Sequence, residues 1–162
     1  MYGVGFAVRN SPLSSVELQS KGTSRIISLR LSTSSGLLNI LSIYAPTLFS
    51  SAEVKDEFYW NLEASIKEFP ATEQLFLRRD FNLRVRADHD SWPRSIGDFG
   101  VGKLNESGQR LLELCSYYDF CITNTYFSTK RYHKVSWCHP RSHHWHQLDL
   151  VITQRTHLPQ YP

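Results

Sequence analysis

The sequence predicts one mixed α/β domain, and three observations support this class. Strand-like apolar segments occur near both ends of the chain, and two segments with helical periodicity lie between them. The chain has 162 residues, of which 41% are hydrophobic and 20% charged, as is usual for a globular protein with one core. Several links between the strand-like segments are short, which favours antiparallel pairing. We therefore expect a single domain over residues 1–162.

Seven segments have the residue pattern of β-strands. In the first two, apolar side chains occur at alternate positions, as in strands with one buried face. The third is almost continuously apolar, which is typical of a strand covered on both faces. It ends at Ala45-Pro46, because proline cannot continue a central strand. The predicted strands are 3–9, 24–31, 37–44, 75–77, 120–122, 135–137 and 148–153.

Two segments have apolar residues at helical spacing. The first begins at Ser50, which forms a capping-box pair with Glu53, and it ends before Pro70. The second begins after Asn105, a residue that caps helices well. Between them, residues 83–104 show little periodicity. A long connection of this kind is either a functional loop or a disordered insertion.

Composition narrows the possible functions only slightly. The net charge of +3 permits a polyanionic partner without requiring one. The odd number of cysteines and the absence of a CxxC pair favour a reducing, intracellular location, and a DNA partner would imply the nucleus. No apolar segment is long enough to cross a bilayer, so we expect no membrane association. The three cysteines are Cys115, Cys121 and Cys138.

Polar groups follow three of the predicted strands at the point where each strand ends. They are Tyr44, the pair Asp80 and Asn82, and Asp149, which is set within an apolar segment. Strand alternation predicts that Asp80 and Asn82 point the same way and that Phe81 enters the core. Each group also has a purely structural explanation: a surface turn, a core aromatic residue or a structural ion pair. Three such strand ends together favour a functional site.

A second cluster of polar residues is the His-rich segment 139–146. The spacing of His139 and His143 could hold a transition metal. No helix is predicted here to fix the geometry of such a site. The alternative is a solvated loop of basic and aromatic residues, which suits contact with phosphates.

Six short motifs, taken in their order along the chain, resemble the endonuclease/exonuclease/phosphatase superfamily. The similarity is greatest to the endonuclease domains of LINE-type retrotransposons, and it covers nearly the whole chain. Each motif alone is weakly specific, whereas their shared order and spacing are strongly specific. The motifs are Tyr44-Ala45-Pro46, Asp80-Phe81-Asn82, Asn105-x-x-Gly108, Asn124-Thr125-x-Phe127, Ser136-Trp137 and Leu148-Asp149.

The resemblance implies a fold, a cofactor and a partner. The fold would be a DNase I-like, two-layer mixed β-sandwich flanked by helices, in four layers of αββα order. The cofactor would be Mg²⁺ and the partner DNA. The chemistry would be phosphodiester hydrolysis, in which a cation offsets the charge that develops in the transition state.

The resemblance also assigns roles to individual residues. Asp80 would orient or deprotonate the attacking water, and Asn82 would hold the phosphate or Asp80. Tyr44 would contact the phosphate, Asp149 would pair with a histidine, and Ser136 would support the site from thirteen positions before Asp149. No metal ligand is assigned, although Asp80 and Asn82 are the nearest candidates. The substrate-binding residues would be Asn105, Trp137 and Arg84.

The sequence also departs from the family pattern. The family's first strand, with an asparagine and a metal-binding glutamate, would precede Met1, and its Ser-Asp-His segment would follow Pro162. The role of that histidine is not transferred to His157. Arg79 and Arg86 replace family glycines, and the charge of Arg79 would compete with Mg²⁺ for Asp80.

These departures lead us to expect a domain that is incomplete at both ends and has weak or no hydrolysis. The main alternative is a non-catalytic module that binds DNA or chromatin. A third possibility is an unstable product with exposed strand edges.

Overall fold

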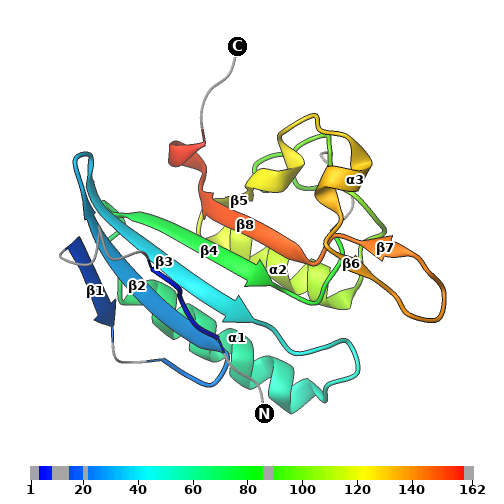
Figure 1. Ribbon diagram of the computed structural model, residues 1–162, viewed down its shortest axis with the longest axis horizontal. Helices are drawn as coiled ribbons and strands as arrows, with labels where there is room; N and C mark the ends of the chain where they lie inside the picture. Colours follow the sequence, from blue (N-terminus) through cyan, green and yellow to red (C-terminus); the bar gives the residue numbers. More distant parts are fainter. Residues whose placement is uncertain (1–3, 9–14, 20–21, 86–89, 159–162) are drawn as a thin grey trace.

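The computed structural model describes residues 4–8, 15–19, 22–85 and 90–158 (Figure 1). Within these residues the chain forms a six-stranded sheet in the order β1-β2-β3-β4-β8-β5 and a two-stranded sheet, β6-β7. The strands are β1 (Val16–Gln19), β2 (Ile26–Thr33), β3 (Gly36–Tyr44), β4 (Gln74–Asp80), β5 (Phe120–Ile122), β6 (Trp137–Cys138), β7 (Trp145–His146) and β8 (Asp149–Gln154). The helices are α1 (Ala52–Lys67), α2 (Glu106–Tyr117) and α3 (Arg131–Lys134), with 3₁₀ turns at Thr123–Thr125 and Arg155–His157.

The predicted mixed α/β class is confirmed, and the large sheet is itself mixed. β3 and β4 pair in parallel, whereas the other neighbouring strands pair antiparallel. The expectation of antiparallel pairing therefore fails at one position. The reason is α1, which connects β3 to β4 and returns the chain to the edge of the sheet where β3 began.

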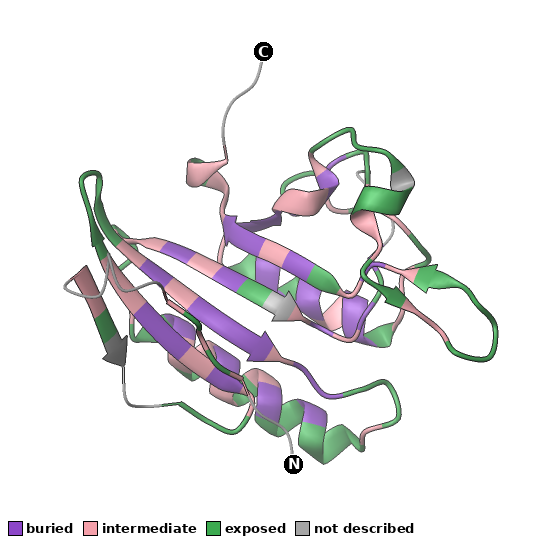
Figure 2. Ribbon diagram, in the orientation of Figure 1, coloured by how far each residue is buried: buried purple, intermediate pink, exposed green. Residues whose placement is uncertain are grey.

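Helices α1 and α2 cover one face of the large sheet and form the core with it (Figures 1 and 2). Leu62 of α1 and Leu111 of α2 are fully buried, as are Leu41 and Leu77 of the central strands. Each buried leucine contributes roughly 1.5–3 kcal/mol relative to an exposed position. The helices are thus fixed to the sheet by the apolar sides of both.

The opposite face of the sheet is less completely covered. Strand alternation places Ile40, Phe76 and Val151 on this face, and all three are only half-buried. Residues 4–8 lie against it, since Phe6 and Ile40 line the same cavity. The predicted strand 3–9 is wrong for its described part, because residues 4–8 pair with no strand within the described chain.

Several element boundaries differ from the predicted ones. The first helix begins at Ala52, with Ser51 rather than Ser50 as its N-cap, and Ser51 makes no side-chain capping bond. β6 begins two residues later than predicted, at Trp137. Asn105 caps α2 as predicted, since its side chain accepts a hydrogen bond from the backbone N–H of Gly108 at 2.8 Å.

Three elements were not predicted, namely β1, β7 and α3. All three are short, so they contain too few residues to show periodicity. In the segment 83–104, the described residues form neither helix nor strand, as expected. Arg86 lies outside the described residues.

Candidate functional site

Three of the predicted site residues lie side by side at one edge of the large sheet. In the strand register, Tyr44 of β3 is paired with Asp80 of β4, and Asp80 is paired with Asp149 of β8. We call these three residues the strand-end row. Residues paired across neighbouring strands project from the same face of the sheet. The register therefore brings together three groups that the sequence could only assign to separate strand ends.

Backbone hydrogen bonds continue beyond the strands and fix the ends of this row. The N–H of Ala45 donates to the carbonyl oxygen of Asp80 at 2.9 Å, and the N–H of Phe81 donates to that of Leu148 at 3.2 Å. Phe81 is 1% exposed, so its predicted place in the core is confirmed. The position of the strand-end row thus depends on core packing directly behind it.

Asn82 has a different geometry from the predicted one. β4 ends at Asp80, and Asn82 adopts a left-handed conformation with φ 48°, so strand alternation does not extend to it. Its backbone N–H donates to Oδ1 of Asp80 at 2.8 Å, and its side-chain amide donates to the carbonyl of Ala45 at 2.8 Å. Asn82 therefore orients the Asp80 carboxylate and ties it to the end of β3.

Ser136 and Asn124 both hold β8 along the same edge of the strand. The hydroxyl oxygen of Ser136 accepts hydrogen bonds from the backbone N–H groups of Leu148 at 3.2 Å and Asp149 at 3.3 Å. Oδ1 of Asn124 accepts from the N–H of Val151 at 2.7 Å. Ser136 therefore fixes the backbone at the start of β8, while its supporting role in a catalytic site stays a prediction. The bond of Asn124 shows why an Asn-Thr motif follows β5.

Arg78 is a residue that the sequence reasoning did not select. It is exposed, and it lines a cavity of about 640 Å³ together with Ser42, Asn124 and Asp149. Among the described residues, its guanidinium makes no hydrogen bond or ion pair. The signal was present in the sequence, because Arg78 lies two positions before Asp80 in one strand and so shares its face. The Arg79 side chain lies outside the described residues.

Two of the predicted substrate-binding residues lie near His146: Trp137 of the β6-β7 hairpin and Arg84 of the segment after β4. Trp137 is 41% exposed, and its ring stacks on that of His146 with centroids 5.8 Å apart. The pKa of His146 is held below its usual value, chiefly by burial and then by the positive charge of Arg84 and the neighbouring His139 and His144. Arg84 is exposed and near enough to His146 to act on it. Trp137 and Arg84 therefore lie around the same imidazole.

Asn105 stabilises the local structure through its side chain, whether or not it also contacts substrate. Its side-chain oxygen accepts from the N–H of Gly108 and also from the N–H of Arg84 at 3.3 Å. Its amide nitrogen is buried and has no hydrogen-bond partner within the described part of the chain. Asn105 therefore links the start of α2 to the segment that carries Arg84, while its predicted substrate contact stays a prediction.

The His-rich segment does not form a metal site among the residues that the structure describes. No group of three or more His, Cys, Asp or Glu side chains is arranged there, or elsewhere in the described chain, to hold a metal ion. Nδ1 of His139 accepts backbone hydrogen bonds from Ser142 at 3.1 Å and Arg141 at 3.3 Å, so this nitrogen stabilises the hairpin turn. The histidines of segment 139–146 belong to the β6-β7 hairpin.

With this geometry established, comparison with solved structures defines the class of the fold. The endonuclease domain of TRAS1, a telomere-specific non-LTR retrotransposon, superposes with a TM-score of 0.60 at 12% sequence identity. The similarity covers 85% of this chain and 52% of that domain. The chain therefore has the fold of a retrotransposon endonuclease domain. No family model matches the sequence.

Sequence comparison adds a particular relative. The chain is 30% identical over 131 residues to craniofacial development protein 2 of Bos taurus, and 29% identical over the same length to that of Tragulus javanicus. It is a distant homologue of craniofacial development protein 2, and the predicted resemblance is confirmed. The matches cover 81% of this chain and 22% of each relative, so the chain spans about a fifth of their length. Within the described residues, no helix has the length and apolar character needed to span a membrane.

Proposed function

We propose that the strand-end row is a nuclease-type phosphodiester site that binds the DNA backbone and hydrolyses it weakly or not at all. The observation that carries this proposal is the row itself: Tyr44, Asp80 and Asp149 stand in one register. On the same face lies Arg78, which has no ion-pair partner among the described residues. The fold of a retrotransposon endonuclease domain supports DNA as the partner.

In this proposal the residues of the site divide between anion binding and water activation. Arg78 and the Tyr44 hydroxyl would contact the non-bridging oxygens, because a guanidinium and a hydroxyl both donate hydrogen bonds to phosphate. Asp80, oriented by Asn82, would orient or deprotonate a water. Ser136 would hold Asp149 in place through the two backbone bonds that it accepts.

A magnesium ion fits the described residues poorly. Mg²⁺ prefers oxygen ligands and usually takes one or two carboxylates together with substrate phosphates. Asp80 and Asp149 could supply two carboxylates, but Oδ1 of Asp80 already accepts a hydrogen bond, and the cavity already holds the guanidinium of Arg78. A fixed positive charge disfavours a second cation nearby. The described site is thus better suited to a phosphate anion than to Mg²⁺, which is the basis for expecting impaired hydrolysis.

The alternative is a module that binds DNA or chromatin without any cleavage, and the β6-β7 hairpin favours it. Trp137 and Arg84 are exposed beside His146, and a hairpin with an aromatic face and positive charge can contact a nucleic-acid backbone. Both proposals predict DNA binding. They differ in whether any strand scission depends on Asp80.

One experiment separates these outcomes. Purified protein is incubated with supercoiled plasmid and Mg²⁺, and binding of a labelled duplex is measured by fluorescence anisotropy between about 50 and 200 mM salt. We expect salt-dependent binding, little nicking, and weaker binding in Arg78→Gln. Vigorous nicking that disappears in Asp80→Ala would refute impaired hydrolysis, whereas binding without any nicking that Arg78→Gln leaves unchanged would favour the non-catalytic module. Absence of salt-dependent DNA binding would refute both.

We also propose that the half-buried face of the six-stranded sheet packs against a second sheet, as in the four-layer αββα order expected from the resemblance. The half-buried Ile40, Phe76 and Val151 support this, since an apolar sheet face is normally covered. The present chain should then bind a hydrophobic dye such as ANS, and Phe76→Ser should reduce that fluorescence. Equal fluorescence of both proteins would argue against a second sheet at this face.

A further inference from the structure

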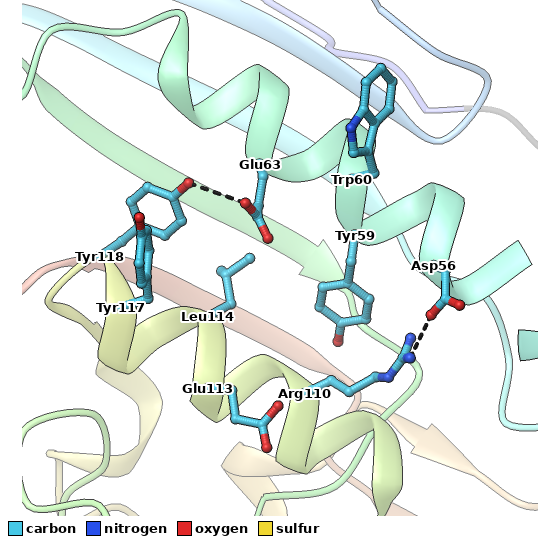
Figure 3. A pocket seen from close by; sticks show the side chains of 9 residues that line it. All are labelled: Asp56, Tyr59, Trp60, Glu63, Arg110, Glu113, Leu114, Tyr117 and Tyr118. Atoms are coloured by element: carbon cyan, nitrogen blue, oxygen red, sulfur yellow. Dashed lines mark hydrogen bonds and ion pairs between the residues drawn. The ribbon is translucent and has the colours of Figure 1, made fainter. Parts of the chain in front are cut away.

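A groove between α1 and α2 lies on the helical side of the molecule, opposite the face of the sheet that carries Arg78. Figure 3 shows its side chains, which come from both helices and from the turn after α2. Its volume is about 470 Å³. We call it the helix groove, and it is lined by Asp56, Tyr59, Trp60, Glu63, Arg110, Glu113, Leu114, Tyr117 and Tyr118.

The side chains at the floor of the helix groove are held in place by contacts, whereas two aromatic rings at its rim are largely exposed to solvent. Tyr59 donates a hydrogen bond to the carbonyl of Ser107 at 3.1 Å, and Tyr118 stacks on Phe120 with centroids 5.8 Å apart. In contrast, Trp60 is 72% exposed and Tyr117 is 78% exposed. Two large aromatic rings that stand in solvent on either side of a preformed groove are typical of an interaction surface.

The charge around these rings is negative. Together α1 and α2 carry six carboxylates and three basic side chains, a net charge of −3, although the whole chain is at +3. Asp56 pairs with Arg110, and Glu63 lies 3.5 Å from the ammonium of Lys67. Glu113 is exposed. Among the described residues its carboxylate accepts a hydrogen bond from the neutral amide of Gln109 at 3.0 Å and has no ion-pair partner.

The exposed aromatic rings and the negative charge together indicate which kind of ligand the helix groove can bind. DNA and anionic lipid would be repelled by the carboxylates. A second copy docking through the same groove would bring two acidic surfaces together, which is unfavourable at a symmetric contact. A cationic segment satisfies both features, because an arginine side chain can lie flat on Trp60 or Tyr117 and pair with a carboxylate at the same time.

We propose that the helix groove binds an arginine-bearing peptide segment of a partner protein. One arginine lies on the exposed ring of Tyr117 and pairs with Glu113, which is on the same helix, and an apolar side chain next to it contacts Leu114 at the floor. A second cationic side chain of the segment contacts Trp60 on the α1 side of the groove. Because the groove and Arg78 lie on opposite sides of the sheet, such a segment binds without competing with DNA.

The test uses a fluorescein-labelled arginine-rich peptide and a matched peptide in which glutamine replaces every arginine. Fluorescence anisotropy should show binding of the arginine peptide alone. Trp60→Ala should weaken it about tenfold and Glu113→Gln about threefold, since both changes are at exposed positions and remove a stacking partner or a charge. Phe49→Ala is the matched control, because Phe49 is an aromatic residue outside the groove and is 99% exposed.

Three results would overturn the proposal. The first is equal affinity for the arginine and glutamine peptides. The second is an affinity that Trp60→Ala and Phe49→Ala change equally. The third is self-association in sedimentation velocity that Trp60→Ala abolishes, which would assign the groove to a second copy of this chain.

Discussion

Replacement of Gly108 by alanine should destabilise the protein, although alanine is the better helix former. A β-carbon at this position would lie 2.2 Å from the backbone carbonyl oxygen of Arg84 and 3.0 Å from Cδ1 of Leu104. The oxygen belongs to the backbone, so it cannot be relieved by a side-chain rotation. The segment that carries Arg84 must therefore move away from the start of α2.

The size of the effect follows from the contacts that this movement breaks. Asn105 donates its N–H to the carbonyl of Arg84 at 3.4 Å and accepts from its N–H at 3.3 Å. Overpacking costs about 1–3 kcal/mol, and each lost hydrogen bond adds about 0.5–1.5 kcal/mol. Alanine returns about 1 kcal/mol through helix propensity. We expect a net loss of about 1–5 kcal/mol in the free energy of unfolding.

Thermal unfolding followed by circular dichroism measures this change. For a chain of this length the melting temperature should fall by about 2–20 °C. Ser116→Ala, an exposed change on the same helix, is the control and should leave the melting temperature unchanged or slightly raised. If Gly108→Ala melts at or above the temperature of the parent protein, the close approach of Arg84 to α2 is not a real constraint and the reasoning fails.

Three further predictions concern the site. Arg78→Gln should weaken binding of a DNA duplex and reduce its salt dependence by about one counterion, measured by anisotropy, and an unchanged salt slope would exclude a phosphate contact. Ser136→Ala leaves the N–H groups of Leu148 and Asp149 without their acceptor, so urea denaturation should show a loss of about 1–3 kcal/mol, whereas no loss would mean that water replaces the hydroxyl. Because the pKa of His146 is lowered in the folded protein, the unfolded chain binds more protons below the usual value of 6.5, so stability should fall as the pH drops through that value, and His146→Gln should flatten the profile.

The parts of the fold that could be predicted from the sequence are those with a long repeating pattern. The strand that ends at Tyr44 and the helix over Leu62 have enough apolar residues for their period to be recognised, so both were found within a few residues of their true ends. β7, with two residues, shows no period at all. Its pairing with β6 depends on a contact between Trp137 and His146 that no local pattern encodes.

The sequence predicted which residues form the site, but it did not predict how these residues are arranged relative to one another. A polar residue after an apolar strand indicated Tyr44, Asp80 and Asp149 separately. Their common register follows from the parallel β3–β4 pair, which the sequence did not indicate. Arg78 was overlooked because a cation in a strand is ordinarily interpreted as a surface residue. Only the cavity that Arg78 lines together with Asp149 indicates a functional role.

The strand-end row also couples ligand binding to folding. Asp80 and Asp149 are directly opposed in an antiparallel pair. Like charges at opposed positions lower the stability of a sheet by about 0.2–1 kcal/mol. Any ligand that offsets this repulsion in the folded state raises the melting temperature by mass action. A thermal-shift screen of cations would therefore identify ligands of the row from their effect on folding, without any assay of catalysis.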